Sequence, residues 1–338
     1  FIQKDSSVIH NSTCQLGVEI LPISEALTKY DWLAEKYLWK SIDPDKDAFT
    51  AGAHKNPHEG FFMRIQAGTK VEHPIQSCLY IAKNNFSQNV HNILVVEEGA
   101  EVHIITGCAT APHLNSGLHV GVSEFYIEKG ATLNYTMVHD WGETVNVRPR
   151  TVTHVAEGGT YISNYISLKP VGSLEMFPTT YLDGPEAVAR FNSVLVAAEG
   201  CLLDVGSRVV LNAPRTRAEI ISRAIAAGGR IIARGDLVGN HPEIKAHLEC
   251  KGLILKNGLM HAVPELSGSV PGVEMSHEAA VGKIDRREIE YLMARGLDED
   301  EAVSTIVRGF LNVDIEGLPE ALREQLDQAI AETQEDMM

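Results

Sequence analysis

"LVVEEGAEVHII" (94–105) and "FYIEKGATLNYT" (125–136) each place one glycine between two runs rich in apolar and β-branched residues. Glycine adopts positive φ without steric cost, so each stretch predicts two short strands joined by a turn. The interval from Gly99 to Gly130 is close to thirty positions. A regular spacing in this range is typical of stacked structural units that share one core.

The same pattern recurs through the middle of the chain at intervals that are mostly close to thirty positions. Two architectures are consistent with it, a β-propeller and a parallel β-helix. A propeller blade needs four strands and about forty residues, and the aromatic content is only 6%. We therefore expect a mainly β protein built as a parallel β-helix. The further copies are "MRIQAGTKVEHP" (63–74), "THVAEGGTYISN" (153–164), "VLVAAEGCLLDV" (194–205), "ISRAIAAGGRII" (221–232) and "GLILKNGLMHAV" (252–263).

Both ends of the chain show helical spacing instead. From Ser24, "SEALTKYDWLAEKYLWKSI" repeats apolar residues every three or four positions. Near the other end, Asp285 and Asp298 are each followed three residues later by Glu, the pattern of a capping box. A third helix is expected from about Pro319, with Leu322, Leu326 and Ile330 on one face. The expected division is an N-terminal helical region (1–58), a β-helix core (59–275) and a C-terminal helical region (276–338).

Charge and composition exclude several classes of function. The chain has 338 residues and a formal net charge of −16, which opposes binding to nucleic acid, since that affinity depends on clustered cations. It contains no uninterrupted apolar run long enough for a membrane span, which needs about 20 residues. The five cysteines are an odd number and widely spaced, which makes a disulfide framework improbable. These features indicate a cytoplasmic protein.

The segment "EIKAHLECKGLILKNG" (243–258) is the first candidate for chemistry. Strand alternation places Cys250 on the apolar face, where it is either an inert core thiol or a shielded ligand for a soft metal. His277 and Glu278 follow one repeat later, so stacking of successive coils brings them near Cys250. In an extended segment these two neighbours face opposite ways, and one of them then acts as a supporting partner.

Four ordered segments resemble the SufB/SufD family of iron–sulfur cluster assembly proteins. They are "GFFMRIQAGTKVEHPI" (60–75), "GCATAPHLNSGLHVGVSEFYIEKGA" (107–131), "LNAPRTRAEIISRAIAAGGRIIARGDL" (211–237) and "MSHEAAVGKIDRREIEYLMARGLDEDEA" (275–302). The resemblance implies a right-handed parallel β-helix flanked by helices, acting as a non-enzymatic scaffold for a transient iron–sulfur cluster. It also implies docking of SufC, an ABC-type ATPase, on the helices of 285–311, and leaves a role for flavin open.

The resemblance assigns roles to individual residues. Cys250 matches the SufB cysteine proposed as a cluster ligand, Glu278 the neighbouring SufB-type glutamate, and His277 the histidine shared with SufD. Cys108 falls in the Gly-Cys segment without an assigned role. The mixture of SufB-like and SufD-like features suits a homodimer, with assembly with a paralogue as the alternative. The candidate residues for docking the ATPase are Ile289, Leu292, Val303, Ile306 and Phe310.

Residue chemistry agrees with a scaffold. A stably held cluster normally has four thiolate ligands, whereas one chain here supplies Cys250 with His277 or Glu278. No G-x-x-x-x-G-K-[ST] motif occurs in the sequence, so ATP hydrolysis is expected in the partner. Two alternatives are a purely structural adaptor for the ATPase and a carbohydrate-active enzyme. The enzyme would use paired carboxylates from among Asp183, Glu186, Asp204 and Glu219.

Overall fold

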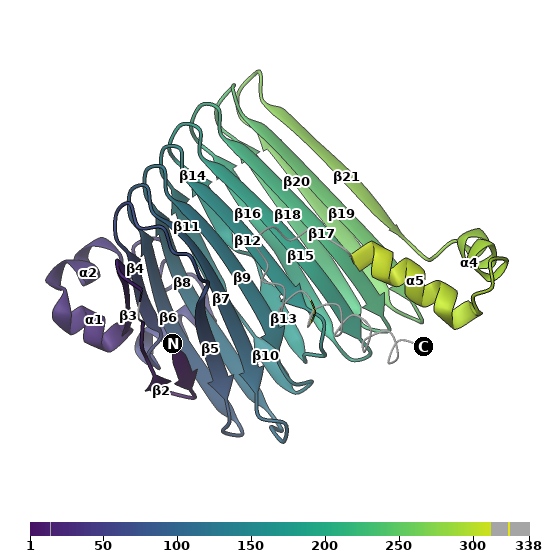
Figure 1. The fold of residues 1–338 in the computed structure, drawn as a ribbon, viewed down its shortest axis with the longest axis horizontal. Helices are drawn as coiled ribbons and strands as arrows, with labels where there is room; N and C mark the ends of the chain where they lie inside the picture. Colours follow the sequence, from purple (N-terminus) through teal and green to yellow (C-terminus); the bar gives the residue numbers. More distant parts are fainter. Residues whose placement is uncertain (14, 312–323, 325–338) are drawn as a thin grey trace.

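Two sheets of parallel strands, stacked coil upon coil, form the body of the protein (Figure 1). The computed structural model describes residues 1–13, 15–311 and 324. The described residues form a ten-stranded sheet, sheet A, and an eleven-stranded sheet, sheet B, with short helices at both ends of the stack. The expected parallel β-helix with terminal helices is therefore confirmed.

The strands of sheet A are, in spatial order, β2 (Ser7–His10), β1 (Ile2–Lys4), β5 (Ile75–Ile81), β7 (Glu101–Thr110), β9 (Thr132–Asp140), β12 (Thr160–Ser167), β15 (Val188–Ala198), β17 (Arg217–Ala227), β19 (Lys245–Leu255) and β21 (Glu274–Gly282). Those of sheet B are, in chain order, β3 (Val18–Pro22), β4 (Phe61–Ile65), β6 (Phe86–Val96), β8 (Gly117–Ile127), β10 (Val145–Val147), β11 (Arg150–Val155), β13 (Ser173–Met176), β14 (Thr179–Leu182), β16 (Leu202–Leu211), β18 (Arg230–Gly239) and β20 (Leu259–Gly268).

Each coil lies in register on the one before it. Thr160 pairs with Val188, Val188 with Arg217, and Arg217 with Lys245, so each turn of the helix adds nearly the same length of chain. Paired residues in parallel strands face the same side, so identical positions of successive coils form rows along the tube. The inward rows of both sheets meet in one apolar core. One such row is Leu133, Tyr161, Ala189, Ala218 and Ala246.

The expected glycine turns are confirmed at six of the seven repeats. The glycines at 68, 99, 130, 158, 200 and 228 all have positive φ. Gly258 differs, because the positive φ in its turn belongs to Lys256 instead. A Cβ at Gly258 would lie 2.0 Å from the carbonyl oxygen of Ala226, so this glycine is needed for close backbone approach rather than for turn conformation.

The N-terminal region contains strands as well as helices. β1 and β2 form a hairpin that extends sheet A, and β3 pairs antiparallel with β4 at the edge of sheet B. A single helix from Ser24 to Ile42 is wrong, since the chain is extended at Tyr30 and has positive φ at Trp39. The helices are α1 (Ile23–Lys29), α2 (Asp31–Lys36) and α3 (Ala48–Lys55).

These helices cover part of the outer face of sheet B. Ile23, Ala26 and Leu33 pack on Phe62 and Ile93, and α3 packs through Ala53 on a second apolar cluster.

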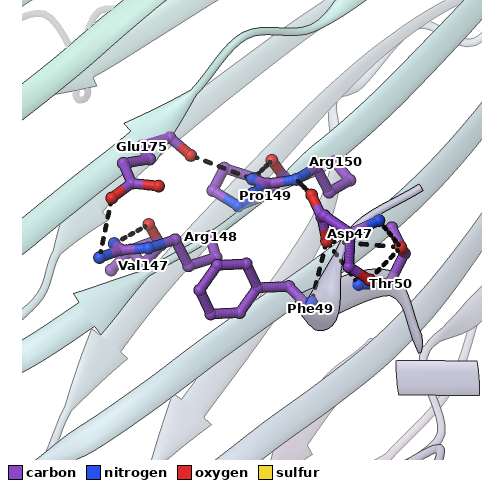
Figure 2. Close-up of polar contacts among 8 residues, drawn as sticks. All are labelled: Asp47, Phe49, Thr50, Val147, Arg148, Pro149, Arg150 and Glu175. Carbon is purple, nitrogen blue, oxygen red and sulfur yellow. Dashed lines mark hydrogen bonds and ion pairs between the residues drawn. The ribbon is translucent and has the colours of Figure 1, made fainter. Parts of the chain in front are cut away.

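An ion-pair clamp fixes the start of α3 on sheet B (Figure 2). Asp47 caps α3 by accepting hydrogen bonds from the backbone N–H groups of Phe49 and Thr50, and it forms a 2.6 Å ion pair with Arg150. The guanidinium groups of Arg148 and Arg150 lie 5.5 and 5.3 Å from the centre of the Phe49 ring. Cap, ion pair and cation–π contacts therefore hold one helix end against the tube.

The C-terminal helices are α4 (Arg286–Met293) and α5 (Glu299–Leu311), and α5 lies across the strands of sheet A (Figure 1). Asp298 and Glu301 form the expected reciprocal capping box, whereas Asp285 caps α4 through the N–H of Arg287. The expected boundary at 275 falls inside β21, which continues the β-helix to Gly282. The helix expected from Pro319 lies outside the described residues. None of the described helices combines the length and apolar character needed to span a membrane.

Substitution of Gly60 tests how tightly the coils are stacked. Gly60 has a φ of +122°, and a Cβ there would lie 2.1 Å from the carbonyl oxygen of His91. We expect Gly60→Ala to lower the free energy of unfolding by more than about 2 kcal/mol. Gly68 also has positive φ, but a Cβ there meets no atom within 4 Å. Gly68→Ala is therefore the matched control and should cost about 1 kcal/mol in urea unfolding; equal costs would contradict the close approach.

Candidate functional site

Cys250 lies on the inner face of β19, in the last complete coil of the tube. Its side chain is fully buried, at 0% exposure. Ser222 pairs with it on β17, and Ser193 on β15 occupies the same row. These two serines also line a small internal cavity of about 50 Å³, together with Ser163 and Tyr165. Cys250 thus ends a row of hydroxyl groups inside an otherwise apolar core.

Burial controls the protonation of this thiol. Loss of hydration raises the pKa of Cys250 to about 11, although the nearby guanidinium of Arg223 acts in the opposite direction. The group is therefore a neutral thiol near neutral pH. It becomes a thiolate only when a metal ion or another electrophile replaces the proton.

His277 and Glu278 lie on β21, the last strand of sheet A, and both are exposed. In the register between β19 and β21, His277 pairs with Leu248, Glu278 with Glu249, and Ala279 with Cys250. His277 consequently shares the inner face with Cys250, on the next strand and displaced by two residues. Glu278 faces the outside of the tube, as the alternation of an extended segment requires.

Outside the tube, Glu278 belongs to a network of four charges. Lys251 lies 2.9 Å from Glu249 and 3.3 Å from Glu278, and Arg223 forms an ion pair with Glu249. Burial alone would raise the pKa of Glu249, but hydrogen bonds from Lys251 and Arg223 hold it below its ordinary value. This network joins β17, β19 and β21 on the face opposite the thiol.

The predicted ligands are thus only partly brought together. Cys250 and His277 share one face and one end of the tube, while the wall formed by β19 and β21 separates Glu278 from the thiol. Across the part of the chain that the structure describes, no three His, Cys, Asp or Glu side chains converge as a metal site. One chain therefore offers an incomplete set of donors at this end.

The candidate docking residues occupy different environments. Val303 and Phe310 pack with the buried Val307 on the outer face of sheet A, so the apolar stripe of α5 is covered by its own chain. Ile289 is also buried. Leu292 and Ile306 are half-buried, and Tyr291 on α4 is 57% exposed.

Sequence patterns alone did not single out a polar cluster inside the tube. His119 Nδ1 lies 2.9 Å from Gln88 Oε1, and His139 Nδ1 lies 2.6 Å from the Tyr165 hydroxyl. Burial lowers the pKa of both histidines to about 3, so both are neutral imidazoles. The signal that could have revealed them is histidine at inward positions of the strands in "GLHVG" and "TMVHDW".

Cys108 neighbours this cluster. It pairs with His139 in the register between β7 and β9, and burial raises its pKa far above the ordinary value. The thiol is 2% exposed. Its inward position was not assigned from the sequence.

The carboxylates considered for a carbohydrate-active enzyme are each engaged by a basic side chain, as an ion pair with Arg or a hydrogen bond with His154. Their partners lie on the neighbouring coil and are partly or fully exposed, an arrangement typical of a charged protein surface. The pairs are Asp183 with His154, Glu186 with Arg215, Asp204 with Arg234, and Glu219 with Arg190.

Comparison with known proteins gives consistent relationships. The sequence profile described as "SUF system FeS cluster assembly, SufBD core domain" matches residues 79–310. An iron–sulfur cluster assembly SufBD family protein of Archaeoglobus fulgidus is 49% identical, across all of this chain and 91% of the relative. A SufBD family protein of Methanothermobacter thermautotrophicus is 48% identical over 95% of this chain and 80% of its own length. The SufB protein of Bacillus subtilis is 30% identical over 94% of this chain and 70% of its own length.

The raised pKa of Cys250 predicts a pH-dependent contribution to stability. A buried thiol stabilises the fold below the pKa of the unfolded state, near 9, and this contribution is lost as pH rises toward about 11. We expect the stability difference between the unmodified chain and Cys250→Ala to shrink by up to about 1.4 kcal/mol per pH unit across this interval. Urea unfolding at several pH values measures it, and Cys108 cancels because both proteins contain it. A difference that stays constant to pH 11 would contradict the buried thiol.

Proposed function

The chain belongs to the SufBD family of the SUF system for iron–sulfur cluster assembly, and we propose that it is the scaffold on which a nascent cluster is built and then passed on. The observation that carries the proposal is the position of a buried thiol, Cys250, and an imidazole, His277, on the same face of the last two strands of sheet A. A thiolate and an imidazole are both ligands for iron.

The incomplete donor set suits a cluster that is cargo rather than a resident cofactor. Four thiolates hold a cluster stably, whereas the inner face here offers Cys250 and His277. Each bond to Cys250 requires displacement of a proton from a thiol whose pKa is about 11. Both features weaken retention of the cluster, and weak retention favours its transfer to an acceptor. Glu278 then supports the site from outside through Lys251 rather than as a partner of the thiol.

A second subunit would complete the ligand set. β20 and β21 are the last described strands of their sheets, and each leaves one edge without a strand partner. Exposed apolar side chains lie at this end of the tube, with Leu259 at 52% and Val281 at 39% exposure. We propose that a second copy, or a SufB- or SufD-like paralogue, associates here. A two-fold interface at β20 and β21 doubles the number of donors near Cys250.

The proposed energy source is a separate ABC-type ATPase of the SufC kind. Because the sheet covers the apolar stripe of α5, the contact surface must be the side of α4 and α5 that faces away from the tube. That side carries Tyr291 and, at its border, the half-buried Leu292 and Ile306. Val303, Phe310 and Ile289 then act indirectly, by fixing the two helices in place.

Anaerobic reconstitution with iron and sulfide tests the scaffold. We expect Cys250→Ala to lose most of the visible charge-transfer absorption and His277→Ala to lose a smaller part, because a thiolate contributes more of this absorption than an imidazole. Cys78→Ala is the control, since Cys78 lies on the far coil β5. Equal spectra for Cys250→Ala and Cys78→Ala would remove Cys250 from the site and favour an adaptor without a metal role.

Paired aspartate substitutions on α5 test the docking surface. We expect Ile306→Asp to abolish copurification with the ATPase while leaving the free energy of unfolding nearly unchanged. Phe310 packs on sheet A. Phe310→Asp should therefore lower the free energy of unfolding by about 2 kcal/mol or more. Survival of the complex with Ile306→Asp would move the docking surface elsewhere.

A further inference from the structure

The outer face of sheet A is divided into a covered and an open part. α5 covers the later parts of the strands through contacts with Ile166, Val194 and Ile225. At the start of the same strands lies an open groove of about 860 Å³ that crosses β12, β15, β17, β19 and β21. The residues that line it include Ile162, Val188, Arg190, Arg217, Lys245 and His247.

The groove carries more positive than negative charge, in a chain whose net charge is −16. Its cations are Arg190, Arg217 and Lys245, and its acids are Glu219 and Glu274. Arg190 lies 3.1 Å from Glu219, and Lys245 lies 2.8 Å from Glu274. Arg217 is exposed and forms no ion pair with any described residue. The guanidinium of Arg217 is therefore available to pair with an acidic group that enters the groove.

A buried polar row lies between the groove and α5. Thr136 and Asn164 are fully buried, and Asn192 is 3% exposed, although these residues are on the outward face of the sheet. Asn192 Nδ2 donates to Asn164 Oδ1 at 2.8 Å. The Oδ1 atom of Asn192 is buried and accepts no hydrogen bond within the described part of the chain. Leaving a buried hydrogen-bond acceptor without a partner costs about 1–3 kcal/mol of folding free energy. We therefore expect the segment that covers this row to supply a hydrogen-bond donor to Asn192 Oδ1.

The chain itself supplies a matching segment. α5 ends at Leu311, which is 1% exposed and packs on the outer face of sheet A. The sequence continues through 312–338, with eight Asp or Glu against one Arg. It also has apolar residues at four-residue intervals, at Leu318, Leu322, Leu326 and Ile330. An acidic segment with regularly spaced apolar residues thus follows a helix that packs on the same face of sheet A as the groove.

We propose that residues 312–338 bind back across this groove of the same chain, with carboxylates at Arg217 and Lys245 and apolar side chains against Ile162 and Val188. Five neighbouring strands span about 19 Å at a spacing of roughly 4.8 Å. A segment of this length reaches about 40 Å even at the short rise of a helix, so it is long enough. The groove includes Glu274 and Ser276 of β21. The bound segment therefore supports the strand that also carries His277.

Zero-length carbodiimide crosslinking of the full chain, mapped by mass spectrometry, tests this proposal. Lys245 should couple to a carboxylate within 312–338, and the Lys245–Glu274 pair provides an internal positive control. The double variant Leu322→Asp/Leu326→Asp should lose the first crosslink and keep the second. Leu16→Asp is the matched control, because Leu16 is 95% exposed and lies outside the groove. A Lys245–Glu274 crosslink without any crosslink to 312–338 would overturn the proposal.

Proteolysis separates this arrangement from exchange between subunits. Cleavage of 312–338 by a glutamyl endopeptidase should be several-fold faster in Arg217→Ser than in the unmodified chain. Lys36→Ser removes an exposed cation from α2, which packs on sheet B, and should leave the rate unchanged. Equal rates for the two variants would count against the groove. Crosslinks to 312–338 found only in species of twice the monomer mass would show that another copy occupies it.

Discussion

The in-register pairing of successive coils is the constraint on which the rest of the structure depends. In a strand, a slip of one residue moves every side chain to the opposite face. Such a slip of β21 relative to β19 would turn His277 outward and Glu278 inward. Inward rows such as the one from Leu133 to Ala246 run through several coils. A slip in any coil would therefore remove apolar side chains from the core and lower the free energy of unfolding. The position of the candidate site is therefore a consequence of core packing.

The same wall supports different chemistry on its two faces. Inside, low hydration keeps Cys250 a neutral thiol and His139 a neutral imidazole. Outside, Lys251 joins Glu249 and Glu278 in a partly exposed ion-pair network. Neighbouring residues of one strand point to opposite faces, one into the core and one to the outside. A substitution on one face therefore changes the contacts on the other face only if it shifts the pairing register of the strand. In the proposed scaffold, this separation would keep the Cys250 thiol shielded while the outer surface of the same strands stays charged.

The helices at the ends have packing roles that limit their role in binding. α5 uses Val303, Val307 and Phe310 to cover sheet A, and α3 is held by Asp47 and Arg150. An apolar stripe on a helix indicates that something covers it, but does not say whether the cover is the same chain or a partner. Here the covering surface is a sheet formed from strands far earlier in the chain, such as β12 and β15. That is why the helical stripe alone pointed to an intermolecular contact.

Local features of the sequence determined the architecture. Regularly spaced turn glycines, alternating runs and Asp-initiated helices are short-range signals, and the structure bears out the β-helix, the inward face of Cys250 and the cap at Asp298. Tertiary structure decided the remainder. The role of Gly258 and the separation of Glu278 from Cys250 depend on which backbone of another coil lies alongside. Such contacts join residues that are distant in sequence, so no local pattern contains them.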